Sequence, residues 1–274
     1  MKRIKDKMSL FYENSVISWH EHIWYEDKDL TKISKRSYEH FENMKILGFD
    51  RIVISRPVVY ERHCPPENFI AANELVKGFV SEFKEKTYAA AFVNPGFVRE
   101  SVEEIERRVC DDGFVAAKLM HQYFVDDPVT FPIVEKCIEL DIPIILHQGH
   151  SVDEETLTCQ PRLSNGAHIA NLARRYPEAT LVMAHIGGGG DWQWSIKAIA
   201  DCPNVFADIG GSVYDRNLME EAYRYIGADR LLFGTDGMYS SCVGKMIGAK
   251  IPEEDKKKIL SGAAFERFLE GKGK

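Results

Sequence analysis

The sequence lacks several features that would assign it to a specialised class of protein. No apolar run approaches the length needed to cross a bilayer, and the basic segment 1–7 has no apolar core of the kind a signal peptide carries. Basic residues are not in excess, because the formal net charge is −7 and the pI is about 5.8. We therefore expect a cytoplasmic protein with no membrane partner and no nucleic-acid partner.

Paired cysteines and a glycine-rich nucleotide loop are also missing. The six cysteines are scattered and no Cys-x-x-Cys occurs, which favours reduced thiols over a disulfide framework or a cysteine metal site. A doubly wound nucleotide-binding sheet is the main structural rival, but its Gly-x-Gly-x-x-Gly run after the first strand is absent. What is present is a chain of 274 residues, 45% hydrophobic, which can bury a large core.

Short β-type runs alternate with helical segments along the whole chain. The expected strands are 16–22, 51–56, 88–93, 114–120, 142–147, 180–185, 205–211 and 231–236. The expected helices are 31–47, 67–84, 99–110, 128–140, 163–176, 192–200, 217–226 and 252–269. Such apolar strands, each followed by a helix, are typical of a parallel sheet buried on both faces. Eight units without a composition shift predict one α/β domain over 1–274, a (β/α)8 TIM barrel.

Five polar residues stand at the ends of these strands, where barrel active sites lie. His20 and His22 are two apart on the first strand, so their side chains share one face. His147, His185 and Asp236 each end a later apolar run. Any one of them alone could be a capping or loop residue. Together, three imidazoles and a carboxylate predict a site for a divalent ion of the zinc, manganese or iron type.

The sequence motifs at these strand ends resemble those of the amidohydrolase superfamily, specifically the amidohydrolase-2 group of TIM-barrel metal-dependent hydrolases and decarboxylases. The resemblance covers nearly the whole chain. It is carried by the runs 20–22 (HEH), 117–119 (AKL) with 127–128 (DP), 145–149 (ILHQG), 184–188 (AHIGG), 204–208 (NVFAD) and 229–236 (DRLLFGTD).

The resemblance implies a role for each strand-end residue. His20, His22 and His147 would bind the metal, and Asp236 would be a ligand, the general base, or both. His185 would polarise the substrate or bind a second metal. The chain differs from the usual motifs of the family at three places: at Ser18, where Asp is common, in the run 237–239 (GMY) and in the run 262–264 (GAA). No departure removes a ligand, but the second changes the loop over the metal.

Further residues could contact the substrate. Lys118 ends the fourth strand, where some superfamily members carry a carbamylated lysine; a substrate contact or a pairing with a carboxylate is the interpretation we adopt. Glu21 should face the helices and take no part in catalysis. Five loop residues could bind an anionic substrate, although each alone could equally be a solvated surface residue: Arg56, Arg62, His63, Arg162 and Tyr239.

Three functions are compatible with these residues. The first is a metal-dependent hydrolase of small amides, lactones or esters, in which the metal lowers the pKa of water from about 15.7 towards roughly 7. Asp236 would take the water's proton and His185 would stabilise the oxyanion. The alternative is non-oxidative decarboxylation of an aromatic or unsaturated acid; the third is a barrel that only binds a small molecule. One zinc ion is expected, with manganese or iron as alternatives, a second metal left open, and a homodimer as an open assembly.

Overall fold

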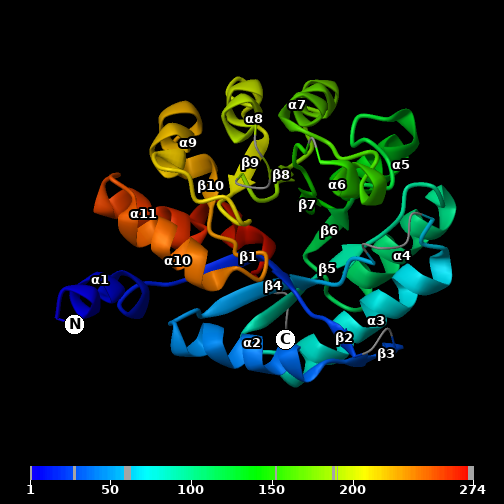
Figure 1. Ribbon diagram of the computed structural model, residues 1–274. Helices are drawn as coiled ribbons and strands as arrows, with labels where there is room; N and C mark the ends of the chain where they lie inside the picture. Colours follow the sequence, from blue (N-terminus) through cyan, green and yellow to red (C-terminus); the bar gives the residue numbers. More distant parts are fainter. Residues whose placement is uncertain are drawn as a thin grey trace.

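The predicted TIM barrel is confirmed by the computed structural model, which describes residues 2–26, 29–58, 63–151, 153–186, 189 and 191–270. Eight parallel strands pair in chain order (Figure 1). They are β1 (Ile17–His22), β4 (Arg51–Ser55), β5 (Thr87–Phe92), β6 (Ala116–Leu119), β7 (Ile144–Leu146), β8 (Leu181–Met183), β9 (Val205–Asp208) and β10 (Leu231–Leu232). Backbone bonds from Trp19 to Phe233 and from Asp236 to His20 join β1 to the β10 end of the sheet.

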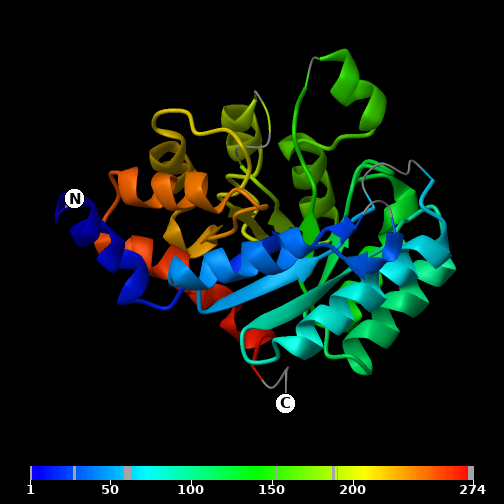
Figure 2. The ribbon, with the colours of Figure 1, turned by 60° about the horizontal axis from the view of Figure 1, so that its bottom comes forward.

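Helices surround the strands on the outside of the barrel (Figures 1 and 2). The α-helices are α1 (Lys2–Tyr12), α2 (Lys35–Ile46), α3 (Pro66–Glu82), α4 (Val98–Cys110), α5 (Phe131–Glu139), α6 (Glu154–Cys159), α7 (Gly166–Arg175), α8 (Trp192–Ala198), α9 (Leu218–Ile226), α10 (Tyr239–Gly248) and α11 (Glu253–Ser261). Three short 3-10 helices are η1 (Pro128–Thr130), η2 (Ala228–Arg230) and η3 (Ala263–Phe268). Within the described ranges, none of these helices is both long and apolar enough to cross a membrane.

Some element boundaries differ from the sequence prediction. The expected helix 31–47 begins only at Lys35, because residues 29–33 form strand β3, which pairs antiparallel with β2 (Tyr25–Glu26). Thr31 and Ile33 are β-branched, which favours the strand. Helices α1, α6 and α10 were not predicted. The expected last helix is divided at Gly262, whose φ of +57° ends α11.

Apolar side chains fill two separate cores. The outer core lies between the strands and the helices. The inner one takes alternate residues of the strands together with η3. The ring of Phe265 on η3 lies 4.9 Å from that of Trp19 and 4.6 Å from that of Phe206. Because η3 follows the last strand and packs inside with these residues, apolar groups close one end of the barrel and the polar strand ends gather at the other, the mouth.

Candidate metal centre

A bulge in β1 directs two histidines into the mouth. The register of β1 against β4 shifts between Ser18 and Glu21. Trp19 packs in the inner core, so simple alternation would turn His20 toward the helices. The shift lets His20 and His22 both face the interior, as bulges beside active sites often do. Their rings lie 4.9 Å apart and nearly perpendicular.

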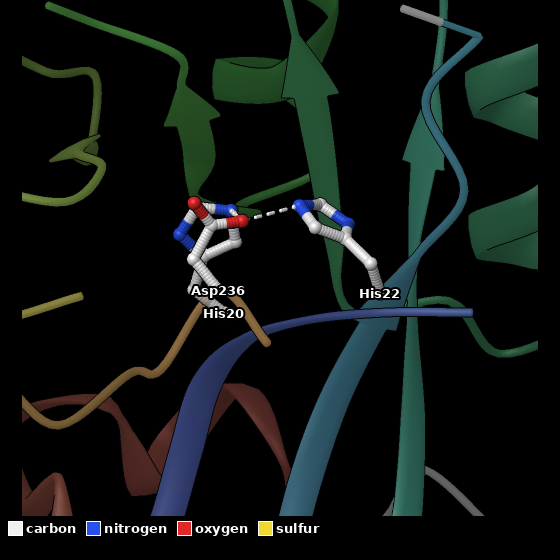
Figure 3. A group of neighbouring side chains, drawn as sticks. All are labelled: His20, His22 and Asp236. Atoms are coloured by element: carbon white, nitrogen blue, oxygen red, sulfur yellow. Dashed lines mark ion pairs between the residues drawn. The ribbon is translucent and has the colours of Figure 1, made fainter. Parts of the chain in front are cut away.

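Three side chains bring one ligand atom each to a common point. The Asp236 carboxylate oxygen lies 2.9 Å from His22 Nε2 and 3.7 Å from His20 Nε2, and all three ligand atoms lie within 4.8 Å of one another. Figure 3 shows the Asp236 carboxylate turned toward His22. An ion lies about 2.1 Å from its nitrogen and oxygen ligands. Ligand atoms 2.9 Å or 3.7 Å apart can therefore bind the same ion.

The hydrogen-bond partners of these two histidines are compatible with a cation site. His20 Nδ1 lies 3.0 Å from the buried Asp208 carboxylate, and His22 Nδ1 lies 3.3 Å from the Ser55 carbonyl oxygen. If each Nδ1–H donates to its oxygen, each Nε2 presents a lone pair toward Asp236. Burial lowers the pKa of His22, although Asp236 opposes this. With this tautomer, two ring nitrogens and a carboxylate oxygen face one another, a donor set that suits a divalent ion.

Asp208 connects two parts of the site from the end of β9. One oxygen accepts from His20, and the other accepts from the backbone N–H groups of His185 and Gly210. Burial alone would raise the pKa of Asp208, but its charge pairing and hydrogen bond with His20 hold that pKa below its usual value. Asp208 was not singled out from the sequence beyond the run 204–208, although it too ends an apolar strand.

His147 and His185 form a hydrogen-bonded pair beside the three-residue group. A φ of +38° places His185 in the left-handed region, uncommon for a histidine. Its ring stacks 5.5 Å from that of His20, and its Nε2 lies 2.9 Å from His147 Nδ1. His147 Nε2 lies 2.9 Å from the side-chain oxygen of Gln160. His147 therefore adjoins the group without belonging to it, and its role as a fourth ligand stays a prediction.

Burial lowers the pKa of both of these histidines. The pKa of His185 falls to about 4, and that of His147 falls well below its usual value. Both imidazoles are thus neutral near pH 7. The other ring nitrogen of His185, Nδ1, is buried and has no hydrogen-bond partner. It is free to interact with a bound molecule.

Lys118 is fully buried on β6 and faces the same mouth. Its Nζ lies 3.0 Å from His20 Nε2. Burial lowers the pKa of Lys118 to about 8, although the charges of Asp236 and Asp208 oppose this. The ammonium donates to the lone pair that would bind an ion, so Lys118 and an ion compete for His20. Its role as a substrate contact stays a prediction.

Arg56 and Tyr239 contact other parts of the chain. The guanidinium of Arg56 donates to the Pro57 carbonyl at 2.5 Å and lies 3.5 Å from the ring centre of Tyr25. The Tyr239 hydroxyl accepts from Asn43 on α2 at 3.2 Å. Their expected substrate contacts stay predictions. Arg62 lies outside the described residues, as do the glycines at 187, 188 and 190.

Glu21 faces the helices, as its position on β1 predicts, but it supports the site from behind. Its carboxylate accepts from Thr235 Oγ1 at 2.6 Å and from the backbone N–H of Gly237 at 3.4 Å. These residues flank Asp236, whose φ of +51° is unusual for aspartate. His40 Nε2 lies 3.2 Å from the same carboxylate. Sequence reasoning missed this supporting role because the partners come from opposite ends of the chain.

Solved structures with a similar fold include two lyases. A dihydroxybenzoic acid decarboxylase from a Polaromonas species, with bound manganese and the inhibitor 2-nitroresorcinol, has a TM-score of 0.73 at 17% identity, covering 93% of this chain and 97% of that one. A 4-oxalomesaconate hydratase from Rhodopseudomonas palustris has a TM-score of 0.69 at 21% identity, covering 93% and 96%. At these identities the similarity establishes the fold alone.

Sequence comparison adds one relative and one family. A 2-keto-4-carboxy-3-hexenedioate hydratase from a Sphingobium species is 27% identical over 158 residues. The match spans 48% of this chain and 44% of the relative, less than half the relative's length. The amidohydrolase-2 family model matches residues 66–268, a stretch that holds His147, His185 and Asp236. That stretch is most of the sequence, and the chain belongs to the amidohydrolase-2 family of the amidohydrolase superfamily.

Proposed function

We propose that the protein is a metal-dependent lyase that removes carbon dioxide from a small aromatic or unsaturated carboxylic acid. The observation that carries the proposal is the ligand group of His20, His22 and Asp236, held in a barrel mouth beside buried Lys118 and His185. Hydrolysis, the first expectation from the sequence, would use the same ligands. The relatives named above are a decarboxylase and hydratases, so they support a lyase better than a hydrolase.

Residues of this chain can bind the acid and handle its proton. In the proposed reaction the bond between a ring or alkene carbon and its carboxylate breaks, the electron pair stays on that carbon, and one proton is added there. The buried ammonium of Lys118 would attract the anionic substrate into the mouth. The neutral ring of His185 would accept a proton from water at its unpartnered Nδ1 and pass that proton to the carbon, which leaves the ring neutral again. Glu21 and Asp208 would keep Asp236, His20 and His185 in place.

A divalent ion bound by His20, His22 and Asp236 would supply a positive centre that stabilises negative charge on a substrate oxygen. We expect manganese in preference to the zinc suggested by the sequence. Two solved relatives of this fold, the Polaromonas enzyme and a 5-carboxyvanillate decarboxylase, hold manganese. Carboxylate ligands also suit manganese.

Metal analysis and a substrate screen test the proposal. We expect about one divalent ion per chain in purified protein by elemental analysis, and loss of that ion in His20→Ala with the barrel still folded by circular dichroism. Metal-loaded protein should then release carbon dioxide from at least one member of a panel of aromatic and unsaturated carboxylic acids. Failure to bind manganese or zinc at all would contradict the metal-dependent reaction.

Hydration of an unsaturated acid is the second candidate, favoured by the Sphingobium relative. The same ligand group would serve it, and the neutral ring of His185 would accept a proton from water at Nδ1. Loss of the substrate's conjugated absorbance without release of carbon dioxide, with oxygen-18 from water in the product, would assign hydration instead. A metal-loaded protein that binds these acids but converts none would favour the non-catalytic barrel.

A further inference from the structure

A cavity of about 420 Å³ lies among the loops on the mouth side of the barrel. Its lining residues are His63, Asn94, Gly96, Phe97, Tyr123 and Arg162. They lie on the connections that follow β4, β5, β6 and β7 in the chain. These connections leave the carboxyl ends of four neighbouring strands, the side of a TIM barrel on which substrates bind.

Two chain segments lead from the proposed ligand His147 into this cavity. Gln160 contacts His147 Nε2 at 2.9 Å, and Arg162 follows two residues later. The ring of His121 lies 6.2 Å from that of His147, and Tyr123 also follows two residues later. Two residues span at most about 7 Å. Arg162 and Tyr123 are therefore each close in the chain to a residue that contacts His147, which puts the cavity wall on the same side of the barrel as the metal centre. Figure 2 shows α6, on the connection that carries Gln160 and Arg162, standing out from the barrel.

Arg162 is held in place but keeps most of its donors. One Nη donates to the Gln122 carbonyl oxygen at 2.8 Å, and the guanidinium carbon lies 5.0 Å from the centre of the Tyr123 ring. Among the described residues, the interactions recorded for Arg162 are these two, and neither is with a carboxylate. A guanidinium has five N–H donors in a planar fork that matches a carboxylate. The remaining N–H groups of Arg162 can thus donate hydrogen bonds to an anionic group.

Asn94 and Gly96 also line the cavity. The amide nitrogen of Asn94 donates to the carbonyl oxygens of His63 and Cys64, and its oxygen accepts from Gly96. The amide nitrogen and oxygen of Asn94 are therefore both used in hydrogen bonds to the backbone. A Cβ at position 96 would lie 3.0 Å from the Tyr123 hydroxyl oxygen, so glycine leaves room at that hydroxyl. Arg162, Tyr123 and the exposed side chain of His63 remain as polar groups that can contact a ligand, and of these only Arg162 carries a permanent positive charge.

We propose that this cavity binds a second carboxylate of the substrate, remote from the one at the reacting carbon. The substrate class is then a di- or tricarboxylic acid, with Arg162 pairing the remote carboxylate and the Tyr123 hydroxyl donating to it. This inference rests on the proposed function for the identity of the substrate. The affinity of the cavity for a second carboxylate can still be tested without turnover.

The test compares dicarboxylic acids with their monocarboxylic analogues. The pairs are isophthalate and terephthalate against benzoate, and 4-carboxycinnamate against cinnamate. Binding to manganese-loaded protein is measured by calorimetry for the unaltered chain, for Arg162→Gln and Arg162→Lys, and for Arg224→Gln. Arg224 lies on α9 and is an exposed arginine paired with Glu221, so its variant controls for loss of a surface charge.

We expect at least one dicarboxylic acid to bind roughly tenfold or more tightly than its analogue, as charge-assisted pairing with arginine predicts. The preference should vanish in Arg162→Gln, recover in part in Arg162→Lys and persist in Arg224→Gln, with metal content and thermal midpoint unchanged. Equal binding of every pair by the unaltered chain, or an equal loss for both members of a pair in Arg162→Gln, overturns the inference. Failure of the lyase proposal appears separately, as absent metal or absent turnover.

Discussion

Single residues make this centre by giving each imidazole an oxygen partner on its far side. His20 has the carboxylate of Asp208 and His22 has the carbonyl of Ser55. Such partners fix the ring and leave the inner nitrogen with a lone pair for an ion. Gly234 contributes by its size, because a Cβ there would lie 3.0 Å from the Cβ of His20 and 3.1 Å from that of Asp208. A side chain at position 234 would therefore crowd both partners.

Asp208→Asn should weaken metal binding without removing a ligand. The amide cannot carry the negative charge that orients His20, so we expect manganese affinity to fall by about 10–100-fold. Competition with a fluorescent chelator measures the affinity. Asp201→Asn, an exposed aspartate just before β9, is the matched control and should bind as the unaltered chain does. Unchanged affinity in Asp208→Asn would show that His20 is oriented without it.

His185→Asn should lower turnover while the ion is retained. His185 does not belong to the group of three ligands, and its Nδ1 is buried without a partner. Loss of a proton-transfer group costs typically 10²–10⁴-fold in rate. The measurement is kcat on the best acid from the screen, with metal content determined on the same sample. His150→Asn alters an exposed histidine nearby and should leave both values unchanged. Loss of the ion in His185→Asn would instead make His185 a ligand.

At the scale of whole elements, small departures from regular geometry direct the side chains. Period-two alternation turns Lys118, His147 and Asp208 inward, because Ala116, Ile145 and Phe206, two positions before each, pack in the inner core. The side chain of His20 points inward only because of the bulge in β1. Ala184 already lies in the inner core, so the next residue, His185, needs its left-handed backbone to turn back toward the mouth. The site therefore depends on a few irregular positions on an otherwise regular barrel.

Two glycine-to-alanine changes in helices should shift stability in opposite directions. A Cβ on Gly166, the first residue of α7, would lie 2.4 Å from the backbone of Ser195 on α8. We expect Gly166→Ala to destabilise the fold by about 1–3 kcal/mol through overpacking. Gly78 lies inside α3 with open space around it, so Gly78→Ala should stabilise by roughly 0.5–1 kcal/mol. Urea unfolding measures both, and a stable Gly166→Ala would show that α7 and α8 can separate cheaply.

For the whole molecule, the barrel separates an apolar closed end from a polar mouth, and the mouth buries several titratable groups together. Burial keeps His147 and His185 neutral, while Asp208 and Asp236 keep their charge because histidines surround them. A mouth of this composition ties the stability of the metal-free protein to pH. The expected homodimer and cytoplasmic location remain predictions at this scale.

The metal-free protein should lose stability as pH falls from about 6.5 to about 4. The pKa of His185 is lowered from 6.5 to about 4 in the fold, so between these values the unfolded chain binds a proton that the folded chain does not. The contribution is fully present above pH 6.5 and disappears toward pH 4, and it is on the order of 3 kcal/mol or less. Urea unfolding at pH 7 and pH 5 measures the change. His185→Asn should reduce the slope and leave the share of His147 and His22, whose pKa values are also lowered, whereas His150→Asn should not change it; an equal slope in all three proteins would assign the effect elsewhere.

Local patterns in the sequence are sufficient to predict the barrel and most of the residues at its mouth. Apolar runs separated by helical segments predict eight parallel strands, and a parallel barrel gathers its strand ends on one side. His147, His185 and Asp236 are therefore placed near His20 by strand order and strand ends alone. The boundary errors fall where local signals conflict, as at residues 29–33, where pairing with β2 replaces the expected helix.

Tertiary structure alone decided the contacts between residues distant in the chain. Asp208 meets His20 across 188 positions, and Thr235 meets Glu21 across 214. Neither pairing has a local signature, because each depends on which strands become neighbours and on their register. The bulge in β1 and the cavity lined by Tyr123 and Arg162 arise in the same way. A sequence carries its own periodicity, but the distance between two side chains on different strands is set only when the sheet closes and its helices pack.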